Sequence, residues 1–213
     1  PTQGHIVVAN RASGTISAID VATSEVETYA LPKGDADPEP MYVVWSPLAG
    51  YVFVGDRANN RVVVFTDGDF ERVGTVPAGE GVFHMCADLL GKQLWVVNDI
   101  DNTATVIDTF TLEVLATVPM PKDLIEAGGK PHDLVVDPLG RYAYVTIINI
   151  ANDTDYVVQF STRTFEETRR AAAGSDSHLA ISLTNPNLYV PSQQSDEVIV
   201  YNRSNLRQRK LFR

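Results

Sequence analysis

Three of the four histidines stand near the start of apolar runs that alternate as β-strands do: His84, His132 and His178. Neutral imidazole nitrogens bind Zn, Cu and haem iron, so three of them brought together predict a metal or haem site. Met41 stands at the corresponding place in an earlier run, and Asp133 follows His132 directly. Zn, Cu or haem is therefore the cofactor to expect if these runs converge.

A packing role for the same histidines, with no cofactor, is the favoured alternative. The sequence contains no His-x-His or Cys-x-x-Cys pair, which would indicate a metal far more strongly. His132 is also offset by about one residue from His84 and His178 within its run, so the three rings need not point to one centre. Cys86 is the sole cysteine, so it has no disulfide partner in the chain, and we interpret it as a small buried apolar residue.

Several polar residues follow apolar runs in short turns: Asp56, Asn98, Asp99 and Asp101. They could contact a ligand or Ca²⁺, and Asp56 and Asn98 join the candidate binding residues for that reason. Their spacing is not that of an EF-hand loop, and Asn and Asp are ordinary turn formers. The sequence shows no G-x-S-x-G elbow, P-loop or dinucleotide fingerprint, so it indicates no catalytic residue and leaves an enzymatic role open, with a non-enzyme favoured.

Composition excludes several classes of protein. The 213 residues carry a formal charge of −10, which disfavours nucleic acid as a partner because phosphate contacts need clustered Lys and Arg. Apolar residues make up 44%, as in a folded protein, yet no apolar run approaches the length of a membrane span. The first residues do not resemble a signal peptide. A near absence of cysteine suits either the cytoplasm or the periplasm and outer surface of a bacterium, and of these we expect a periplasmic or extracellular protein.

The elements that would position these residues repeat along the chain. The centres of the most apolar runs follow one another at steps of 46, 42, 49 and 45 residues. A period of about 45 residues is typical of the four-stranded antiparallel blades of a β-propeller. We therefore expect an all-β chain in which residues 1–213 form one propeller region. The run centres are Val7, Phe53, Trp95, Tyr144 and Tyr189, and the repeats cover approximately 1–40, 41–82, 83–131, 132–177 and 178–213.

Within each repeat four strands follow one another from the channel outward, and we name them a to d. Strand d is the most polar of the four, as expected of an outermost strand in water. The inner strands a are predicted at Met41–Ser46, Phe83–Ala87, His132–Val136 and His178–Leu183.

This pattern resembles the YVTN-type β-propeller repeat family. The matching pieces include Tyr144-Val-Thr146, Leu94-Trp-Val-Val-Asn98 and the stretch from Gly129 to Pro138. The resemblance implies closed rings, often of seven blades. The chain holds about four and a half to five blades, because the first repeat lacks its strand a, and we expect it to be part of a larger ring.

The two longest connections predict a binding surface. Met120–Pro131 joins a strand d to a strand a, and Ile147–Asp155 joins a strand b to a strand c. Both connection types lie on one face of a propeller, and loops on a rigid scaffold often carry function. A protein or small-molecule ligand is the expected partner of this face, where Met41, His84, His132, Asp133 and His178 would border the channel.

Three functions are compatible with these observations. The leading hypothesis is a non-enzymatic binding or scaffold propeller outside the cytoplasm. The first alternative is a metal- or haem-binding propeller, either an oxidoreductase or a metal chaperone, with its site at the channel mouth. The second alternative is a surface-layer or adhesive repeat protein that associates through open blade edges.

Overall fold

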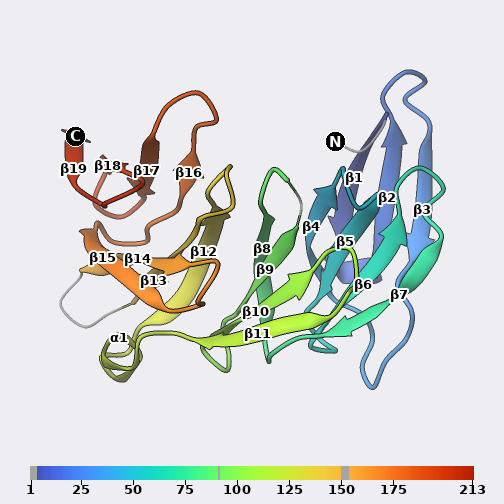
Figure 1. The fold of residues 1–213 in the computed structure, drawn as a ribbon. Coiled ribbons are helices and arrows are strands. Elements are labelled where there is room, and N and C mark those ends of the chain that lie inside the picture. Colours follow the sequence, from blue (N-terminus) through green and yellow to red (C-terminus); the bar gives the residue numbers. More distant parts are fainter. Residues whose placement is uncertain (1–3, 91, 150–153) are drawn as a thin grey trace.

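Consecutive β-meanders build the whole molecule. The computed structural model describes residues 4–90, 92–149 and 154–213. Within them, one three-stranded sheet precedes four sheets of four strands, and every neighbouring pair is antiparallel. The sheets follow one another around an arc with their inner strands on its concave side (Figure 1). The all-β propeller architecture predicted from the repeats is confirmed.

Strand bounds follow the repeats closely. The first two sheets consist of β1 (His5–Asn10), β2 (Thr15–Asp20) and β3 (Val26–Ala30), then β4 (Pro40–Ser46), β5 (Tyr51–Asp56), β6 (Arg61–Thr66) and β7 (Arg72–Pro77). The third and fourth consist of β8 (Val82–Ala87), β9 (Gln93–Asn98), β10 (Thr103–Asp108) and β11 (Val114–Pro119), then β12 (Lys130–Val136), β13 (Tyr142–Ile148), β14 (Asp155–Ser161) and β15 (Glu167–Ala173). The fifth consists of β16 (Ala180–Ile181), β17 (Asn187–Ser192), β18 (Glu197–Asn202) and β19 (Gln208–Phe212).

Two local predictions need correction. The last inner strand, β16, has two residues instead of the span His178–Leu183, so His178 lies in the connection before it. The long connection Met120–Pro131 contains a short helix, α1 (Lys122–Glu126), whose Leu124 is buried in the core. Five residues are too few for a helical period to stand out in a sequence. Among the described residues, no helix has the length and apolarity that crossing a bilayer requires.

The core lies between successive sheets. Phe53 of β5 packs with Met85 of β8 and Leu94 of β9, and similar clusters occupy the other three junctions. The middle strands are buried on both faces, which is why β5, β6, β9 and β10 read as continuous apolar runs. The outer strands are largely exposed, as predicted.

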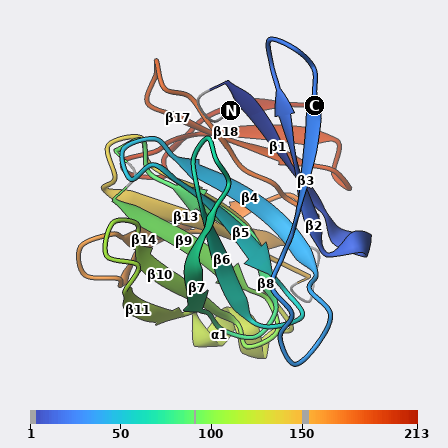
Figure 2. The same cartoon turned by 90° about the vertical axis from the view of Figure 1, so that its right-hand side faces the viewer.

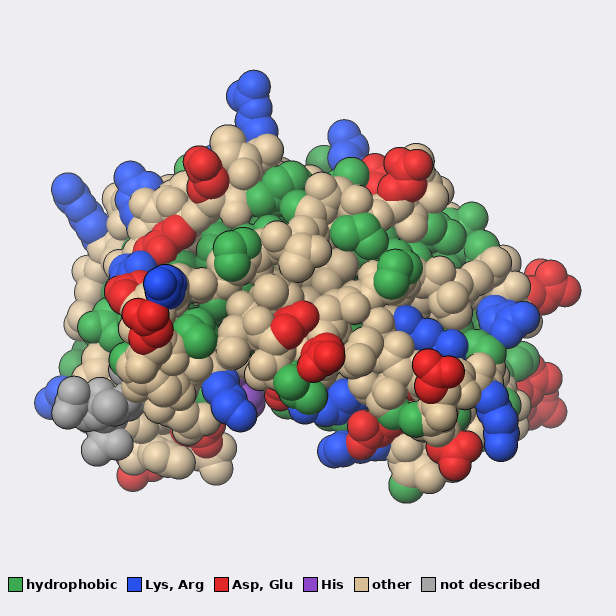
Figure 3. Space-filling model, turned by 90° about the horizontal axis from the view of Figure 1, so that it is seen from below, with side chains coloured by type: hydrophobic (Ala, Val, Ile, Leu, Met, Phe, Trp, Pro, Cys, Tyr) green, Lys and Arg blue, Asp and Glu red, His purple; other side chains and the backbone are tan. Residues whose placement is uncertain are grey.

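Figures 2 and 3 show the other sides of the molecule. Figure 2 shows the sheets from the side, with the long connection between β3 and β4 at the rim. Figure 3 looks at the side that carries β7, β11 and α1, where Lys, Arg, Asp and Glu are interspersed with scattered apolar side chains. Such a mixture of charged and apolar side chains is typical of a solvent-exposed protein surface.

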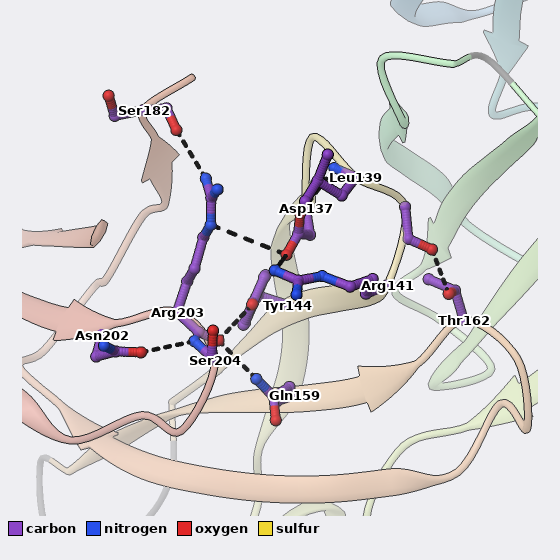
Figure 4. Close-up of polar contacts among 11 residues, drawn as sticks. Asp137, Leu139, Arg141, Tyr144, Gln159, Thr162, Ser182, Asn202, Arg203 and Ser204 are labelled. Atoms are coloured by element: carbon purple, nitrogen blue, oxygen red, sulfur yellow. Dashed lines mark hydrogen bonds and ion pairs between the residues drawn. The ribbon is translucent and has the colours of Figure 1, made fainter. Parts of the chain in front are cut away.

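A buried polar network joins the fourth and fifth sheets (Figure 4). The Tyr144 hydroxyl and the Gln159 amide both donate to the Arg203 carbonyl, at 2.5 and 2.7 Å. The Arg203 guanidinium donates to the Ser182 carbonyl at 2.8 Å, and its Nε lies 3.9 Å from the buried Asp137 carboxylate. The network therefore fixes the turn at Arg203 against the neighbouring sheet.

Candidate functional site

One position of the inner strand recurs in four successive blades. In these four blades the central residue of strand b pairs with one residue of the inner strand. The pairs are Phe53 with Val44, Trp95 with Cys86, Tyr144 with Val135 and Tyr189 with Ala180. Two residues before each of these inner-strand residues stands a side chain that can take part in hydrogen bonding. These four equivalent residues, which we call the mouth ring, are Tyr42, His84, Asp133 and His178.

Two of these residues, His84 and Asp133, lie where the strand pairing is irregular. The register shifts between Val82 and Met85 in β8 and between Pro131 and Leu134 in β12. Such irregularities redirect side chains and are common beside functional sites. In β12 the Asp133 N–H donates to the Thr146 hydroxyl at 2.9 Å, which satisfies a group that the ladder leaves unpaired.

Asp133 is the centre of the mouth ring. Its Oδ1 lies 2.6 Å from His84 Nδ1 and accepts the Leu134 N–H at 2.6 Å. Its Oδ2 accepts the Leu179 N–H at 2.8 Å and lies 3.5 Å from His178 Nδ1. Burial alone would raise the pKa of Asp133, but the hydrogen bond from His84, its charge and the two backbone donors together lower it. Asp133 is therefore a buried carboxylate that binds three blades together.

The contact with Asp133 orients His84. An ionised carboxylate only accepts hydrogen bonds, so His84 Nδ1 donates to Asp133 and Nε2 is the ring nitrogen left for another partner. The Tyr42 ring lies over His84 with ring centroids 4.2 Å apart. With 17% of its side chain exposed, His84 is held in place and still open to a small molecule.

His132 stands one residue before the mouth-ring position. Its ring centroid lies 4.8 Å from that of His178, 5.5 Å from that of Phe83 and 6.2 Å from that of His84. Its Nδ1 is buried and has no hydrogen-bond partner within residues 4–90, 92–149 and 154–213. Burial, together with the neighbouring His178 and His84, lowers the pKa of His132, so that the ring is neutral at neutral pH.

The predicted set of three histidines is thus split in two. His132 and His178 lie with Asp176 in one cluster, whose ligand atoms are all within 4.8 Å of one another. His84 is not in that cluster and instead binds the Asp133 carboxylate. The offset of His132, noted in the sequence, places it one residue before the position that Asp133 occupies in the fourth blade.

A cavity adjoins the mouth ring. Its volume is about 510 Å³, and His84 and Asp133 both line it. The side chains of Tyr42, Trp45 and Cys86 make part of this lining aromatic or apolar. Linings of this kind are usual in small-molecule sites. The described residues of the lining include no Lys or Arg.

Other predicted site residues have structural roles. Met41 is not the counterpart of His84, since strand pairing gives that place to Tyr42 and makes Met41 the counterpart of His132. Asp56 is fully buried, where Arg61 Nε donates to its carboxylate at 2.9 Å. Asn98 is fully buried as well and donates to Thr103 and Thr105. The turn-forming interpretation of Asp56 and Asn98 therefore fits their contacts.

Cys86 behaves as an apolar residue. It packs against the core cluster between the third and fourth blades. Burial raises the pKa of the Cys86 thiol to about 11, so it is not a thiolate nucleophile at neutral pH.

The two long connections lie together, as expected from the order of the strands. A Cβ placed on Gly128 would be 3.5 Å from the Asn149 carbonyl oxygen. Hydrogen bonds join the same two connection types elsewhere, from Arg57 N–H to Glu39 and from Gln193 N–H to Asp176. Residues 150–153 of the predicted binding loop lie outside the described residues.

Sequence reasoning missed Tyr42, Phe83 and Asp176. The run centres already point to Tyr42, which stands as far before Phe53 as His84 stands before Trp95, but the sequence analysis gave this place to Met41. Asp176 stands in a short polar connection without a repeat signal, with a positive φ of 55°. Nothing in its neighbourhood distinguishes it from a turn residue.

The fold and the inner-strand site define a β-propeller with a cavity beside its inner strands. The chain belongs to the family described as "Lactonase, 7-bladed beta-propeller", whose model matches residues 1–210. The YVTN repeat type stays a prediction, and the family gives no support to a non-enzymatic scaffold. No curated protein matches the chain.

Solved structures share the fold at low sequence identity. Hydrazine synthase from Kuenenia stuttgartiensis matches with a TM-score of 0.77 and 13% identity over 95% of this chain and 60% of its own. A putative 6-phosphogluconolactonase from Bacteroides fragilis matches with a TM-score of 0.74 and 15% identity over 97% and 66%. Another from Bacteroides uniformis matches with a TM-score of 0.74 and 18% identity over 98% and 67%. The chain thus spans about two thirds or less of the propeller chains it resembles.

Proposed function

We propose that the protein hydrolyses small lactones at the cavity beside the mouth ring. The observation that carries this proposal is the 2.6 Å contact between His84 Nδ1 and Asp133 Oδ1 on the wall of that cavity. A carboxylate that orients an imidazole is the usual arrangement for activating a hydroxyl group or water as a nucleophile. Membership of a family named for lactonases favours a cyclic ester as the substrate.

The proposed reaction uses His84 as base and then as acid. Nε2 accepts a proton from a water molecule while the water oxygen bonds to the lactone carbonyl carbon. Asp133 stabilises the imidazolium that forms. The tetrahedral intermediate then collapses, the ring C–O bond breaks, and the imidazolium returns its proton to the leaving alkoxide. One water is consumed, and the product is an open-chain hydroxy acid.

Charge around the cavity favours a neutral substrate. The described lining contains Asp88 and Asp133 but no Lys or Arg, so it offers no partner to a phosphate group. The nearby Arg57 is already engaged, since its guanidinium lies 2.8 Å from the Asp99 carboxylate and donates to the Gly81 carbonyl. We therefore propose an unphosphorylated lactone, in contrast to the substrate that the names of the two Bacteroides proteins suggest.

Proton release during ring opening tests this function. The intact protein should acidify a weakly buffered solution of δ-valerolactone faster than the spontaneous reaction does. His84→Gln should lose the enzymatic part of the rate, by at least about 100-fold, because general base catalysis contributes roughly that much or more. His5→Gln, on the first sheet, is the matched control and should retain the full rate. Equal rates for wild type and His84→Gln would refute the proposal.

A ligand-binding protein without catalysis is the second candidate. The proximity of Gly128 and Asn149, which brings the two long connections together, favours this reading. The same lactone separates the two functions. Binding in a calorimetric titration without any release of acid would support the binding protein, whereas saturable acid release would support the hydrolase.

A further inference from the structure

A cluster next to the mouth ring has the chemistry of a metal site. His132, Asp176 and His178 each offer one ligand atom, and these atoms all lie within 4.8 Å of one another. Two imidazoles and a carboxylate form a ligand set that suits Zn²⁺ and its first-row neighbours and leaves further positions open. We propose that these three residues bind a divalent first-row transition metal.

His132 is prepared to act as a ligand. Its Nδ1 is buried without a hydrogen-bond partner among the residues that the structure describes, a situation that costs free energy unless some other group approaches. A metal on His132 would thus engage a ring that the protein itself leaves partly unsatisfied.

Asp133 supports the second imidazole. Its Oδ2 lies 3.5 Å from His178 Nδ1, which leaves His178 Nε2 as the atom for a metal. A carboxylate behind a coordinating histidine fixes the ring and raises its basicity, and this arrangement accompanies most histidine-bound metals. Asp133 therefore serves both His84 on one side and His178 on the other.

The connection that carries Asp176 and His178 is tied down at several points. The Ser177 N–H donates to the Asp155 carboxylate at 3.2 Å, and the His178 N–H donates to the Pro191 carbonyl at 2.8 Å. The Asp176 carbonyl accepts the Gln193 N–H at 3.1 Å. These bonds hold the backbone while the Asp176 carboxylate, which none of them uses, stays available to a cation.

Small side-chain rotations would complete the site. Ligand atoms about 2.1 Å from one tetrahedral ion lie roughly 3.4 Å from one another. The ligand atoms of His132, Asp176 and His178 lie up to 4.8 Å apart and must therefore approach one another to bind one ion. His178 has 41% of its side chain exposed and Asp176 lies in a connection, so both can rotate without disturbing the core. The ligand set also differs from the one expected from the sequence, which was His84, His132 and His178, because Asp176 replaces His84.

Cobalt binding tests the site without reference to turnover. The intact protein, stripped with a chelator, should bind one Co²⁺ with a visible absorption band, and Zn²⁺ should displace it. His178→Ala and Asp176→Asn should weaken binding by at least about 100-fold, since even the loss of a supporting carboxylate costs roughly 10- to 100-fold. His5→Gln and His84→Gln should bind as the wild type does. Thermal unfolding of each stripped variant would confirm that it is folded.

Three outcomes would overturn the site. The first is the absence of stoichiometric metal on the wild-type protein, and the second is wild-type affinity in both His178→Ala and Asp176→Asn. The third is a loss of metal affinity in His84→Gln as large as the loss in those two variants. Because the assay contains no lactone, its result is independent of the proposed hydrolysis.

Discussion

Asp133 and His84 stand at the same position of adjacent blades, and their side chains meet with Oδ1 and Nδ1 2.6 Å apart. Both residues lie where the strand pairing is irregular, between Val82 and Met85 in β8 and between Pro131 and Leu134 in β12. It joins the third blade to the fourth and, through Leu179, the fourth to the fifth. One carboxylate thus combines a structural role with the orientation of a candidate base.

Replacing Asp133 should destabilise the protein. Asp133→Ala leaves the N–H groups of Leu134 and Leu179 without their acceptor in a buried place. Each unsatisfied buried donor costs about 1–3 kcal/mol, so for two donors we expect a loss of about 2–6 kcal/mol in the free energy of unfolding. Denaturant titration measures it. His84→Ala, which removes one partner of Oδ1 and leaves both backbone N–H groups with their acceptor, should cost clearly less, and equal losses would contradict the role given to Asp133.

The junction of the fourth and fifth blades should be sensitive to one hydroxyl. Tyr144→Phe removes one of two donors to the Arg203 carbonyl, while Gln159 keeps the other. We expect a loss of about 1 kcal/mol in unfolding free energy, the usual net worth of one hydrogen bond. Tyr189→Phe is the matched control, because its hydroxyl contacts only Asn185 and Asn187 near the surface, and it should change stability by less than about 0.5 kcal/mol.

Cys86 should make stability depend on pH in alkaline solution. Burial raises its pKa to about 11 from an ordinary value near 9, so between these values the folded protein holds a proton that the unfolded chain has lost. Stability therefore falls as the pH rises through this window. We expect the melting temperature of the wild type to fall more steeply between pH 9 and 11 than that of Cys86→Ala. Parallel curves would show that the thiol titrates normally.

The repeats made most of the fold predictable. A strand with one buried face alternates apolar and polar residues, whereas a strand with two buried faces is apolar throughout. The continuous apolar runs of β5, β9 and β13 could therefore be placed from the sequence. The c–d turns were predictable for a similar reason, since Asp20 and Asp108 accept backbone N–H groups from two residues on, as their position at the turn start suggests.

The candidate site was predictable only in part. The sequence placed His84 and His132 in the right inner strands, but His178 lies in the connection before β16. The irregular pairing between Pro131 and Leu134, where Asp133 lies, has no clear sequence signal. Asp176 lies near His132 and His178 because of the path that the connection between β15 and β16 takes. Long-range geometry of this kind comes from the packing of two blades and not from either repeat alone.

A double-mutant cycle on His84 and Asp133 tests the central claim most directly. The rate of δ-valerolactone hydrolysis, as kcat/KM, would be measured for wild type, His84→Gln, Asp133→Asn and the double variant, with folding checked for each. Residues that act as one unit lose activity non-additively. The account predicts that Asp133→Asn costs little or nothing further once His84 is replaced. Two losses that multiply in full would contradict it, because Asp133 and His84 would then act independently.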